Sequence, residues 1–381
     1  MIKRNLADKL KYFVSKYPIV TVTGPRQSGK TTLIKSIFPD YEYVNFEDPD
    51  MLLLAQEDPR LFLSQYSNKV ILDEAQRLPE LFSYLQSHTD KANKEGMYII
   101  SGSQNFLLME KISQTLAGRT AILKLLPFSK RELANTSIKL KTPDEHIFNG
   151  GYPRLYDKKI DPIDFYPFYI QTYIERDVRQ LQNISNLLQF NRFVKLCAGR
   201  IGQLLNLSSI ANECGITQPT AKAWLSILEA SYIIYLLKPH HKNFNKRLVK
   251  TPKLYFYDTG LACSLLGIQN HSQILTHYLR GGLFENWMIM ELIKKHFNNA
   301  KEPHIYFWRD NTGNEIDLLI ENDLQIEAYE IKSGSTYNKN FFKGLQYWDK
   351  LNNKKTAGSV IYGGNKSMET PYGKLISWQD W

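Results

Sequence analysis

A glycine-rich segment near the start of the sequence carries the residues needed to bind the phosphates of a nucleotide. Glycines allow successive backbone N–H groups to point at one anion. Lys30 would reach the β- and γ-phosphates, and the Thr31 hydroxyl would help to hold Mg²⁺. We therefore expect ATP and Mg²⁺ to bind at a site formed by Gly24, Pro25, Arg26, Gln27, Ser28, Gly29, Lys30, Thr31 and Thr32.

The segments on either side of these residues have the order that such a site requires. Residues 19–23 are mostly β-branched and predict a buried strand. Residues 32–38 have the apolar spacing of a helix, which Pro39 ends. A strand, a glycine loop and a helix place the phosphates at the positive end of the helix dipole.

Two acidic residues follow a second expected strand at residues 69–72. Asp73 would bind Mg²⁺ through water, because this ion prefers hard oxygen ligands. Glu74 would orient the attacking water, because hydrolysis of the γ-phosphate needs an in-line nucleophile. The sequence thus predicts a catalytic glutamate directly after a metal-binding aspartate.

Two further polar positions could complete this site. After a third expected strand at residues 97–100, Ser103 or Gln104 would sense the γ-phosphate, and the sequence does not separate the two. Either residue could instead cap the segment that begins at residue 105. Arg119 follows a glycine and is expected to act as a finger on the ATP of a neighbouring subunit; the alternative is an ordinary surface arginine.

A third group of ionisable residues occurs in the last hundred residues. Asp317 and Glu330 lie on consecutive expected strands, and Lys332 shares a strand face with Glu330. Such carboxylates could ligate Mg²⁺ or Mn²⁺, the lysine could stabilise a pentavalent phosphate, and Glu285 in the first turn of an upstream helix could complete the metal site. The alternative is a set of strand-end charges on a solvated face.

The middle of the chain has the pattern of a helix-turn-helix followed by a wing. Two short helices are expected on either side of Gly215, and two strands, at 233–237 and 254–257, would form a hairpin. Residues 238–253 contain six Lys or Arg and no acidic residue. We expect Gln218, Thr220 and Lys222 to face DNA and the wing lysines to meet phosphates; the alternative is a packing module between domains.

Composition limits the remaining possibilities. A chain of 381 residues should form two or three domains, and its net charge of +10 favours a polyanionic partner such as nucleic acid. The three cysteines, Cys197, Cys214 and Cys263, have no disulfide or metal spacing, so we expect a reducing cytoplasm. No apolar run is long enough for a membrane span, and no membrane association is expected.

The chain resembles a family of prokaryotic AAA-type ATPases with a carboxyl-terminal DUF4143 domain. The resemblance covers nearly the whole chain. It implies an α/β fold with a P-loop parallel-sheet domain at 1–135, a helical linker and winged helix at 136–257, and a restriction-endonuclease-like domain at 258–381. The family also supports Arg119 as the finger. The matching segments are GPRQSGKTTL (24–33), LDEAQ (72–76), SGS (101–103), GYP (151–153), YIERD (173–177), KTPKLYFYDTGL (250–261), GLFEN (282–286) and EIKSG (330–334).

Two functions are compatible with these features. The first is a cytoplasmic Mg²⁺-dependent ATPase that forms homo-oligomers and acts on nucleic acid, with DNA favoured and with a metal-dependent nuclease as its last domain. The second is an ATP-gated switch that binds DNA or protein and whose nuclease fold is inactive. The presence of Glu285, Asp317, Glu330 and Lys332 together favours the first.

Overall fold

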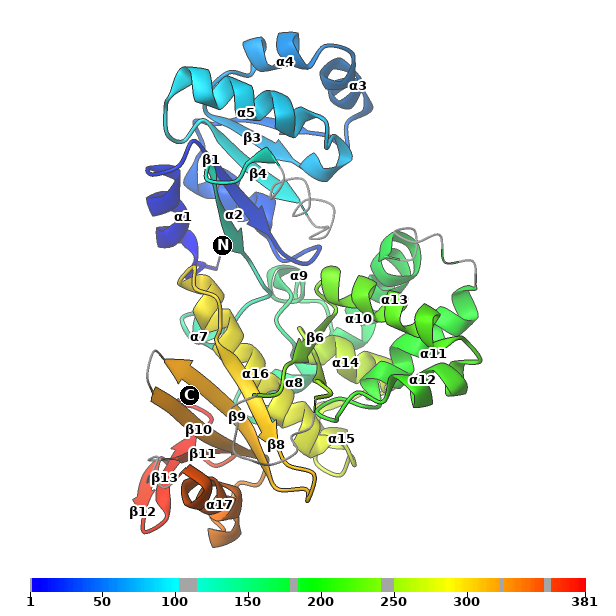
Figure 1. Cartoon of the computed structure of the whole chain (residues 1–381), viewed down its shortest axis with the longest axis vertical. Coiled ribbons are helices and arrows are strands. Elements are labelled where there is room, and N and C mark those ends of the chain that lie inside the picture. The colour runs from blue at the N-terminus through cyan, green and yellow to red at the C-terminus, as the bar shows by residue number, and fades with distance from the viewer. Residues whose placement is uncertain are drawn as a thin grey trace.

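The computed structural model describes residues 2–102, 115–178, 184, 186–240, 250–322, 325–352 and 358–381, without the side chains of residues 176, 177 and 352. A parallel sheet comes first, a mostly helical part follows, and a mixed sheet comes last. In Figure 1 the helix α16 (Arg280–Asn298) runs between the two sheets, with the helical part beside it. The α/β class with an amino-terminal parallel sheet is therefore confirmed.

The first sheet has five strands in the order β2-β3-β4-β1-β5, and all neighbours are parallel. Strand β4 lies between β1 and β3, so the sheet has the additional central strand of one class of P-loop ATPases. All parallel neighbours place the carboxyl ends of the strands along one edge, where ligands bind in such sheets. The strands are β1 (Ile19–Thr23), β2 (Glu42–Asn45), β3 (Val70–Asp73), β4 (Tyr98–Gly102) and β5 (Thr120–Lys124).

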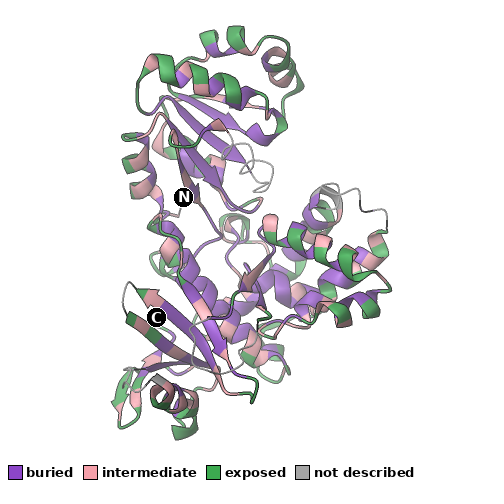
Figure 2. Cartoon of the chain, in the orientation of Figure 1, coloured by how far each residue is buried: buried purple, intermediate pink, exposed green. Residues whose placement is uncertain are grey.

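Helices cover both faces of this sheet, which is why its strands are almost continuously apolar. Alternate residues enter two separate cores: Leu72 packs with Phe82 on one face, and Ile71 packs with Leu10 and Ile34 on the other. Figure 2 shows the central strands as buried. The helices are α1 (Ala7–Val14), α2 (Lys30–Ile37), α3 (Pro49–Glu57), α4 (Pro59–Gln65) and α5 (Leu81–Ala92), with a 3₁₀ turn, η1 (Ala75–Arg77). The next helix, α7 (Lys130–Ala134), lies beside α16 and not on the sheet, and its Lys130 N–H donates to Glu291 of α16 (Figure 1).

The middle part contains the two expected short helices. The first, α12 (Leu207–Cys214), ends at Gly215, whose φ of +66° is the left-handed conformation that glycine adopts easily. The second, α13 (Gln218–Ala230), is capped by the Thr217 side chain, with a proline in its first turn. The other helices are α8 (Pro143–Asn149), α9 (Pro153–Lys158), α10 (Pro162–Tyr169), the π-helix η2 (Ile170–Val178), α11 (Leu187–Ala198), α14 (Thr259–Leu265) and α15 (His271–Ile274).

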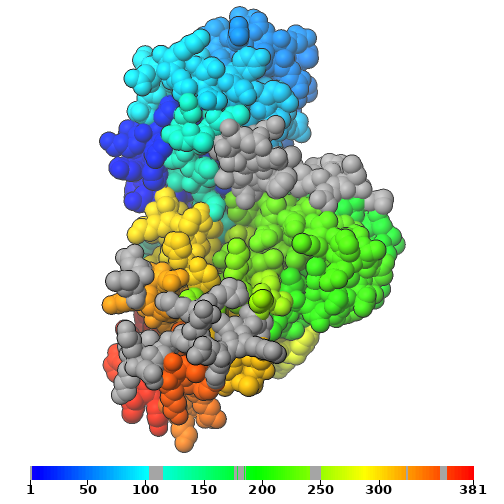
Figure 3. All heavy atoms as spheres, viewed as in Figure 1, coloured from blue at the N-terminus to red at the C-terminus, as the bar shows by residue number. Residues whose placement is uncertain are grey.

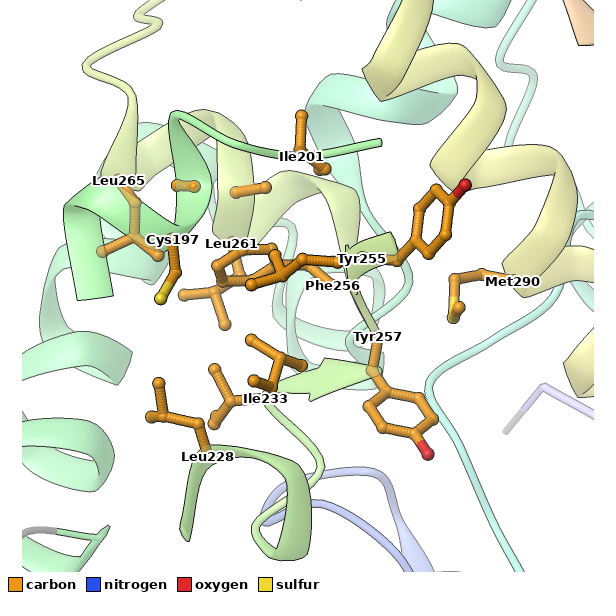
Figure 4. Packing of buried hydrophobic residues seen from close by; sticks show 14 of the residues in the cluster. Cys197, Ile201, Leu228, Ile233, Tyr255, Phe256, Tyr257, Leu261, Leu265 and Met290 are labelled. Carbon is orange, nitrogen blue, oxygen red and sulfur yellow. The ribbon is translucent and has the colours of Figure 1, made fainter. Parts of the chain in front are cut away.

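The two strands expected for the wing, β6 (Ile234–Leu237) and β7 (Lys253–Phe256), are antiparallel neighbours. Their apolar side chains pack into the middle core, where Phe256 and Ile233 lie near Leu228 and Leu261 (Figure 4). The strand pair also contacts the last part of the chain, because the backbone N–H of His240 donates to the Phe307 carbonyl at 2.7 Å. The segment between the strands includes residues 241–249, which lie outside the described residues.

The second sheet has six strands in the order β12-β13-β11-β10-β9-β8. Strands β8, β9 and β10 are antiparallel, and β10, β11 and β13 are parallel. The elements are β8 (Ile305–Arg309), β9 (Glu315–Asn322), β10 (Gln325–Lys332), η3 (Lys339–Phe342), α17 (Lys343–Asn352), β11 (Ser359–Tyr362), β12 (Met368–Thr370) and β13 (Gly373–Ser377). In the space-filling view this part (orange to red) is at the opposite end of the molecule from the first sheet (Figure 3).

Two helix boundaries differ from the sequence prediction. The sequence of residues 2–10 predicts a charged helix, whereas α1 spans Ala7–Val14. Arg4 precedes this helix, and its buried side chain is bonded to Glu132 of α7 and to the Ser28 carbonyl. The helix α16 begins at Arg280 and not at Gly282, which places Glu285 in its second turn. None of the helices formed by the described residues is long and apolar enough to cross a bilayer.

Candidate functional site

The glycine loop connects the carboxyl end of β1 to the start of α2, as the sequence predicted. Gly24 has a φ of +147°, and a Cβ atom there would lie 2.1 Å from the Leu125 carbonyl oxygen. Gly29 caps α2 in the left-handed conformation, with a φ of +89°. Between them, the buried Ser28 hydroxyl has no hydrogen-bond partner among the described residues. The loop therefore has a buried polar group that a phosphate oxygen could satisfy.

Lys30 is the first residue of α2 and is almost fully buried. Its ammonium donates to the carbonyls of Gly24 (3.0 Å) and Pro25 (2.9 Å), so it lies inside the loop. Burial lowers the pKa of Lys30 to about 8, despite the nearby carboxylates of Glu74 and Asp73. An incoming phosphate would replace these neutral acceptors with a negative charge and would raise that pKa again.

Asp73, the last residue of β3, collects hydroxyl donors from three directions. Its Oδ2 atom accepts from the Thr31 hydroxyl and the Tyr43 hydroxyl, each at 2.8 Å, and its Oδ1 atom accepts from Ser101. Burial and the Asp73 carboxylate together raise the pKa of Tyr43. The oxygens of Thr31 and Asp73 meet at the end of the loop, and this donor set fits Mg²⁺.

Glu74 follows β3 in the left-handed conformation, with a φ of +53°. Its carboxylate accepts from the side-chain amide of Gln76, which is buried in the turn after the strand. The expected sensor positions, Ser103 and Gln104, lie outside the described residues. Thus Lys30, Thr31, Asp73 and Glu74, which were all selected from the sequence, come together at one edge of the sheet.

Arg119 lies at the other edge of that sheet. It precedes β5, and its carbonyl accepts from the backbone N–H of Ile19, the first residue of β1. The guanidinium makes a two-pronged ion pair with Asp90 on α5, at 2.6 and 2.9 Å. Arg119 therefore does not contribute to the ATP site of its own chain, and its role as a finger stays a prediction.

The expected carboxyl-terminal residues Asp317, Glu330 and Lys332 also come together. The Lys332 ammonium donates to Asp317 Oδ2 at 2.9 Å and to the Glu330 carboxylate, and the backbone N–H of Ile331 donates to Asp317 Oδ2 at 2.8 Å. Burial opposes ionisation, but Lys332 and Lys253 lower the pKa of Asp317 to about 2. Burial and the Asp317 charge raise the pKa of Glu330.

Glu285 does not complete a metal site with these residues. Its Oε1 atom accepts from the Tyr255 hydroxyl at 2.6 Å and from the Lys253 ammonium at 2.9 Å. Burial raises the pKa of Glu285 to about 7. In the part of the chain that the structure describes, no group of three His, Cys, Asp or Glu residues is arranged to hold a metal ion. The residues as placed here therefore do not fit the second metal ion that the sequence predicted.

Lys253 itself was expected to meet phosphates on the wing, and this prediction is wrong. The residue is 2% exposed, because it points from β7 into the carboxylates of Glu285, Glu315 and Asp317. Burial alone would lower the pKa of Lys253, but these carboxylates raise it well above its ordinary value. Of the other wing lysines, Lys242 and Lys246 lie outside the described residues, as does Arg247.

Comparison with known sequences and domains identifies the family. The chain matches three family models: "AAA domain" at residues 16–134, "Domain of unknown function (DUF8612)" at 140–272 and "Domain of unknown function (DUF4143)" at 280–381. It is also 31% identical over 339 residues to the uncharacterized proteins Rv2008c of Mycobacterium tuberculosis and Mb2031c of Mycobacterium bovis, which covers 88% of this chain and 74% of each relative. The chain belongs to the AAA-type P-loop ATPases with a carboxyl-terminal DUF4143 domain.

Solved structures with a similar arrangement include other proteins with nucleotide-binding domains. One is described as "the walker-type atpase paby2304 of pyrococcus abyssi", with 15% identity and a TM-score of 0.47 over 70% of this chain and 96% of that chain. Another is AMPPCP-bound DnaA from Aquifex aeolicus, with 16% identity and a TM-score of 0.31 over 59% of this chain and 85% of that chain. Because these scores are low, the fold of this AAA-type ATPase is assigned from its own strand order and glycine loop.

The residues of this AAA-type ATPase that were expected to face DNA are accessible on α13. Gln218 and Lys222 are exposed, and Thr220 is half-buried with its hydroxyl 2.8 Å from that of Thr217. The helix keeps its buried side, which includes Trp224, against the middle core. The polar side of α13 is therefore free to contact another molecule.

Several residues around the ATP site were not selected from the sequence. Tyr43 and Ser101 both bind the Asp73 carboxylate, and Gln76 binds Glu74. Ser101 is two residues before Ser103, the first position that was considered as a sensor, so the end of β4 did carry a signal. Arg4 carried no such signal in the sequence, because its partners are distant along the chain. Its guanidinium donates to the Ser28 carbonyl at 2.9 Å and pairs with Glu132, 128 residues away, at 3.0 Å.

Proposed function

We propose that this AAA-type P-loop ATPase hydrolyses ATP with Mg²⁺, forms homo-oligomers and uses hydrolysis to act on nucleic acid. Hydrolysis is supported above all by the meeting of Thr31, Asp73 and Glu74 beside the glycine loop. The hydroxyl of Thr31 is 2.8 Å from the Asp73 carboxylate, and Glu74 is the next residue along the chain. These are the groups that phosphoryl transfer to water requires in this class of site.

Each residue has a distinct part in the proposed reaction. The loop N–H groups and the Ser28 hydroxyl bind the phosphates, and the Lys30 ammonium exchanges its two carbonyl acceptors for phosphate oxygens. Thr31 and Asp73 would hold Mg²⁺, which would neutralise charge on the phosphates. The Glu74 carboxylate orients the water and accepts its proton, and Gln76 fixes that carboxylate in place.

Substitution of Glu74 tests hydrolysis directly. Glu74→Gln should keep ATP binding and lose hydrolysis by about 10²-fold or more, because only the orientation and deprotonation of water are removed. Glu57→Gln, which changes an exposed carboxylate at the end of α3, should hydrolyse ATP like the wild type. A wild-type rate of phosphate release in Glu74→Gln would remove Glu74 from its proposed role.

Nucleic-acid binding is supported by the net charge of +10 and by the accessible polar side of α13. Lys222→Ala should weaken binding of duplex DNA and reduce the slope of log affinity against log salt by about 1, because one phosphate contact is lost. Lys9→Ala on α1, a lysine of the first domain, should leave the slope unchanged. A slope that Lys222→Ala does not alter would place the DNA surface elsewhere.

An ATP-gated binding switch is the second candidate, and one observation favours it. The Lys253 ammonium lies beside Glu285 and Asp317, two of the carboxylates that were predicted to hold the metal ion of a nuclease, and this supports an inactive nuclease fold. In that case the ATP site would control binding through the middle part. The strand that leads into the glycine loop contacts the middle part, because the hydroxyls of Thr23 in β1 and Tyr232 are hydrogen-bonded at 2.9 Å. DNA affinity that changes with nucleotide, without cleavage in Mg²⁺ or Mn²⁺, would support the switch.

A further inference from the structure

The carboxyl-terminal part contains a buried ammonium group surrounded by carboxylates. The Nζ atom of Lys253 is 2.9 Å from Glu285 Oε1 and 3.9 Å from Asp317 Oδ1, and it contacts the Glu315 carboxylate. The Lys253 side chain is 3% exposed, and those of Glu285 and Asp317 are 12% and 11% exposed. The three carboxylates come from α16 and from one face of β9, whereas the lysine comes from β7.

Buried carboxylates need a positive charge close to them, since an unpaired buried charge is strongly destabilising. In a metal-dependent site of this kind the charge would come from a divalent ion bound by carboxylate oxygens. Here the Lys253 ammonium lies beside Glu285 Oε1, Glu315 and Asp317 Oδ1. The other oxygen of Asp317 accepts from Lys332, and Glu315 also pairs with Arg309. A divalent ion cannot occupy the position of the Lys253 ammonium while that group is there, and the two positive charges repel each other at such short range.

We propose that Lys253 is an internal cation that takes the place of the divalent ion at Glu285, Glu315 and Asp317 and keeps this site free of metal. The side chain acts as a tethered competitor, with an effective concentration that no free ion in solution can match. The carboxyl-terminal site then binds a metal ion only when the Lys253 side chain leaves it.

The position of Lys253 on the hairpin gives the hairpin control over the site. Lys253 is the first residue of β7, paired with Leu237 of β6 and bridged to Leu204. The chain beyond β6 is bonded to β8 through Lys238 and Phe307, whose carbonyl and N–H are 3.2 Å apart. Withdrawal of the ammonium therefore requires either a new side-chain rotamer or a shift of the hairpin relative to β8 and β9.

The test measures Mn²⁺ bound to the nucleotide-free full chain, by electron paramagnetic resonance of the free ion. Every protein carries Asp73→Asn, so that the ATP site does not contribute. Lys253→Met should bind one Mn²⁺ per chain at least about tenfold more tightly than the parent. Lys253→Met with Asp317→Asn should lose that site, and Lys250→Met, which removes an exposed lysine of the same segment, should bind like the parent.

The parent protein provides an independent measurement if Lys253→Met does not fold, as circular dichroism would show. Asp317→Asn should leave Mn²⁺ binding to the parent unchanged, because Lys253 already occupies the oxygens. Mn²⁺ binding by the parent that disappears in Asp317→Asn would overturn the proposal, and so would a folded Lys253→Met that binds no additional ion. The measurement reads metal occupancy in a chain that cannot bind Mg²⁺ at Asp73, so it is independent of the proposed ATP hydrolysis and DNA binding.

Discussion

The buried ammonium of Lys30 should make the stability of the nucleotide-free protein depend on pH. In the unfolded chain Lys30 has its ordinary pKa of 10.5, whereas burial lowers the pKa to about 8 in the folded chain. Between these values the unfolded chain binds more protons, so stability rises with pH. This gain in the free energy of unfolding is complete above pH 10.5, the pKa of Lys30 in the unfolded chain, and is lost as the pH falls through about 8, its pKa in the folded chain.

The size of the effect follows from the two pKa values. At pH 7 Lys30 is mostly protonated in both the folded and the unfolded chain, so the difference between its two pKa values contributes almost nothing to the pH dependence of stability. At pH 9.5 the folded side chain is mostly neutral and the unfolded side chain is mostly charged, which gives about 2 kcal/mol. Lys30→Met has no titrating group at this position, so the wild type should gain about 2 kcal/mol over Lys30→Met between these two pH values.

The assay is urea unfolding of the wild type, Lys30→Met and Lys30→Arg at both pH values in the absence of metal and nucleotide. Taking the difference between pH values removes constant effects, including the loss of the two carbonyl contacts of Lys30. Comparing the wild type with the two variants removes the contribution of Lys130, whose pKa burial also lowers to about 8. Lys30→Arg should behave like Lys30→Met, because arginine stays charged.

Equal pH dependence of the wild type and Lys30→Met would refute this account of the loop. Saturating ATP·Mg²⁺ supplies a second check. Phosphates beside the ammonium should raise its pKa towards the ordinary value, so the additional gain of the wild type should shrink when the nucleotide is bound. A gain that persists with ATP bound would mean that Lys30 does not face the phosphates.

Two other predictions concern association and the junction between domains. Mixed oligomers of Arg119→Ala and Lys30→Ala should recover part of the ATP hydrolysis that each variant lacks alone. The Lys30→Ala subunit supplies the arginine finger, and the Arg119→Ala subunit supplies the intact glycine loop. Mixed oligomers that recover no hydrolysis would exclude a finger that acts on a neighbouring subunit. His146, stacked on Trp287 at 5.0 Å, has its pKa lowered to about 4 by burial and by Lys130, so stability should fall as the pH drops below 6.5. Between pH 7.5 and pH 5 the free energy of unfolding of the wild type should fall by about 2 kcal/mol more than that of His146→Phe. Urea unfolding followed by tryptophan fluorescence measures both, and equal losses in the two proteins would contradict this prediction.

Residues that depend on local pattern could be predicted from the sequence. The glycine loop and the Asp73–Glu74 pair each follow a short apolar strand, and parallel strands bring such ends to one edge. Asp317, Glu330 and Lys332 could be predicted for a similar reason, since alternation along β10 fixes which side chains share a face. In these cases the chemistry and its position are encoded within a few neighbouring residues.

Residues that depend on distant packing could not be predicted in this way. Lys253 belongs to a run of basic residues, which suggested a solvated surface, but its partner Glu285 is 32 residues away on another element. Arg4 looked like part of a charged helix, whereas its position is set by Glu132 and the Ser28 carbonyl. A single sequence does not show which of many lysines or arginines finds a buried carboxylate.

The buried pair of Arg4 and Glu132 has an evolutionary consequence. Both side chains are almost fully enclosed, and Glu132 also accepts from the Asn5 backbone N–H at 2.9 Å. Loss of one partner leaves the other charged and desolvated, at a cost of about 3–5 kcal/mol, which few proteins of ordinary stability can tolerate. Substitutions at the two positions should therefore be inherited together, so that diverging lineages keep both charges or replace both, and a lineage with only one of them should be rare.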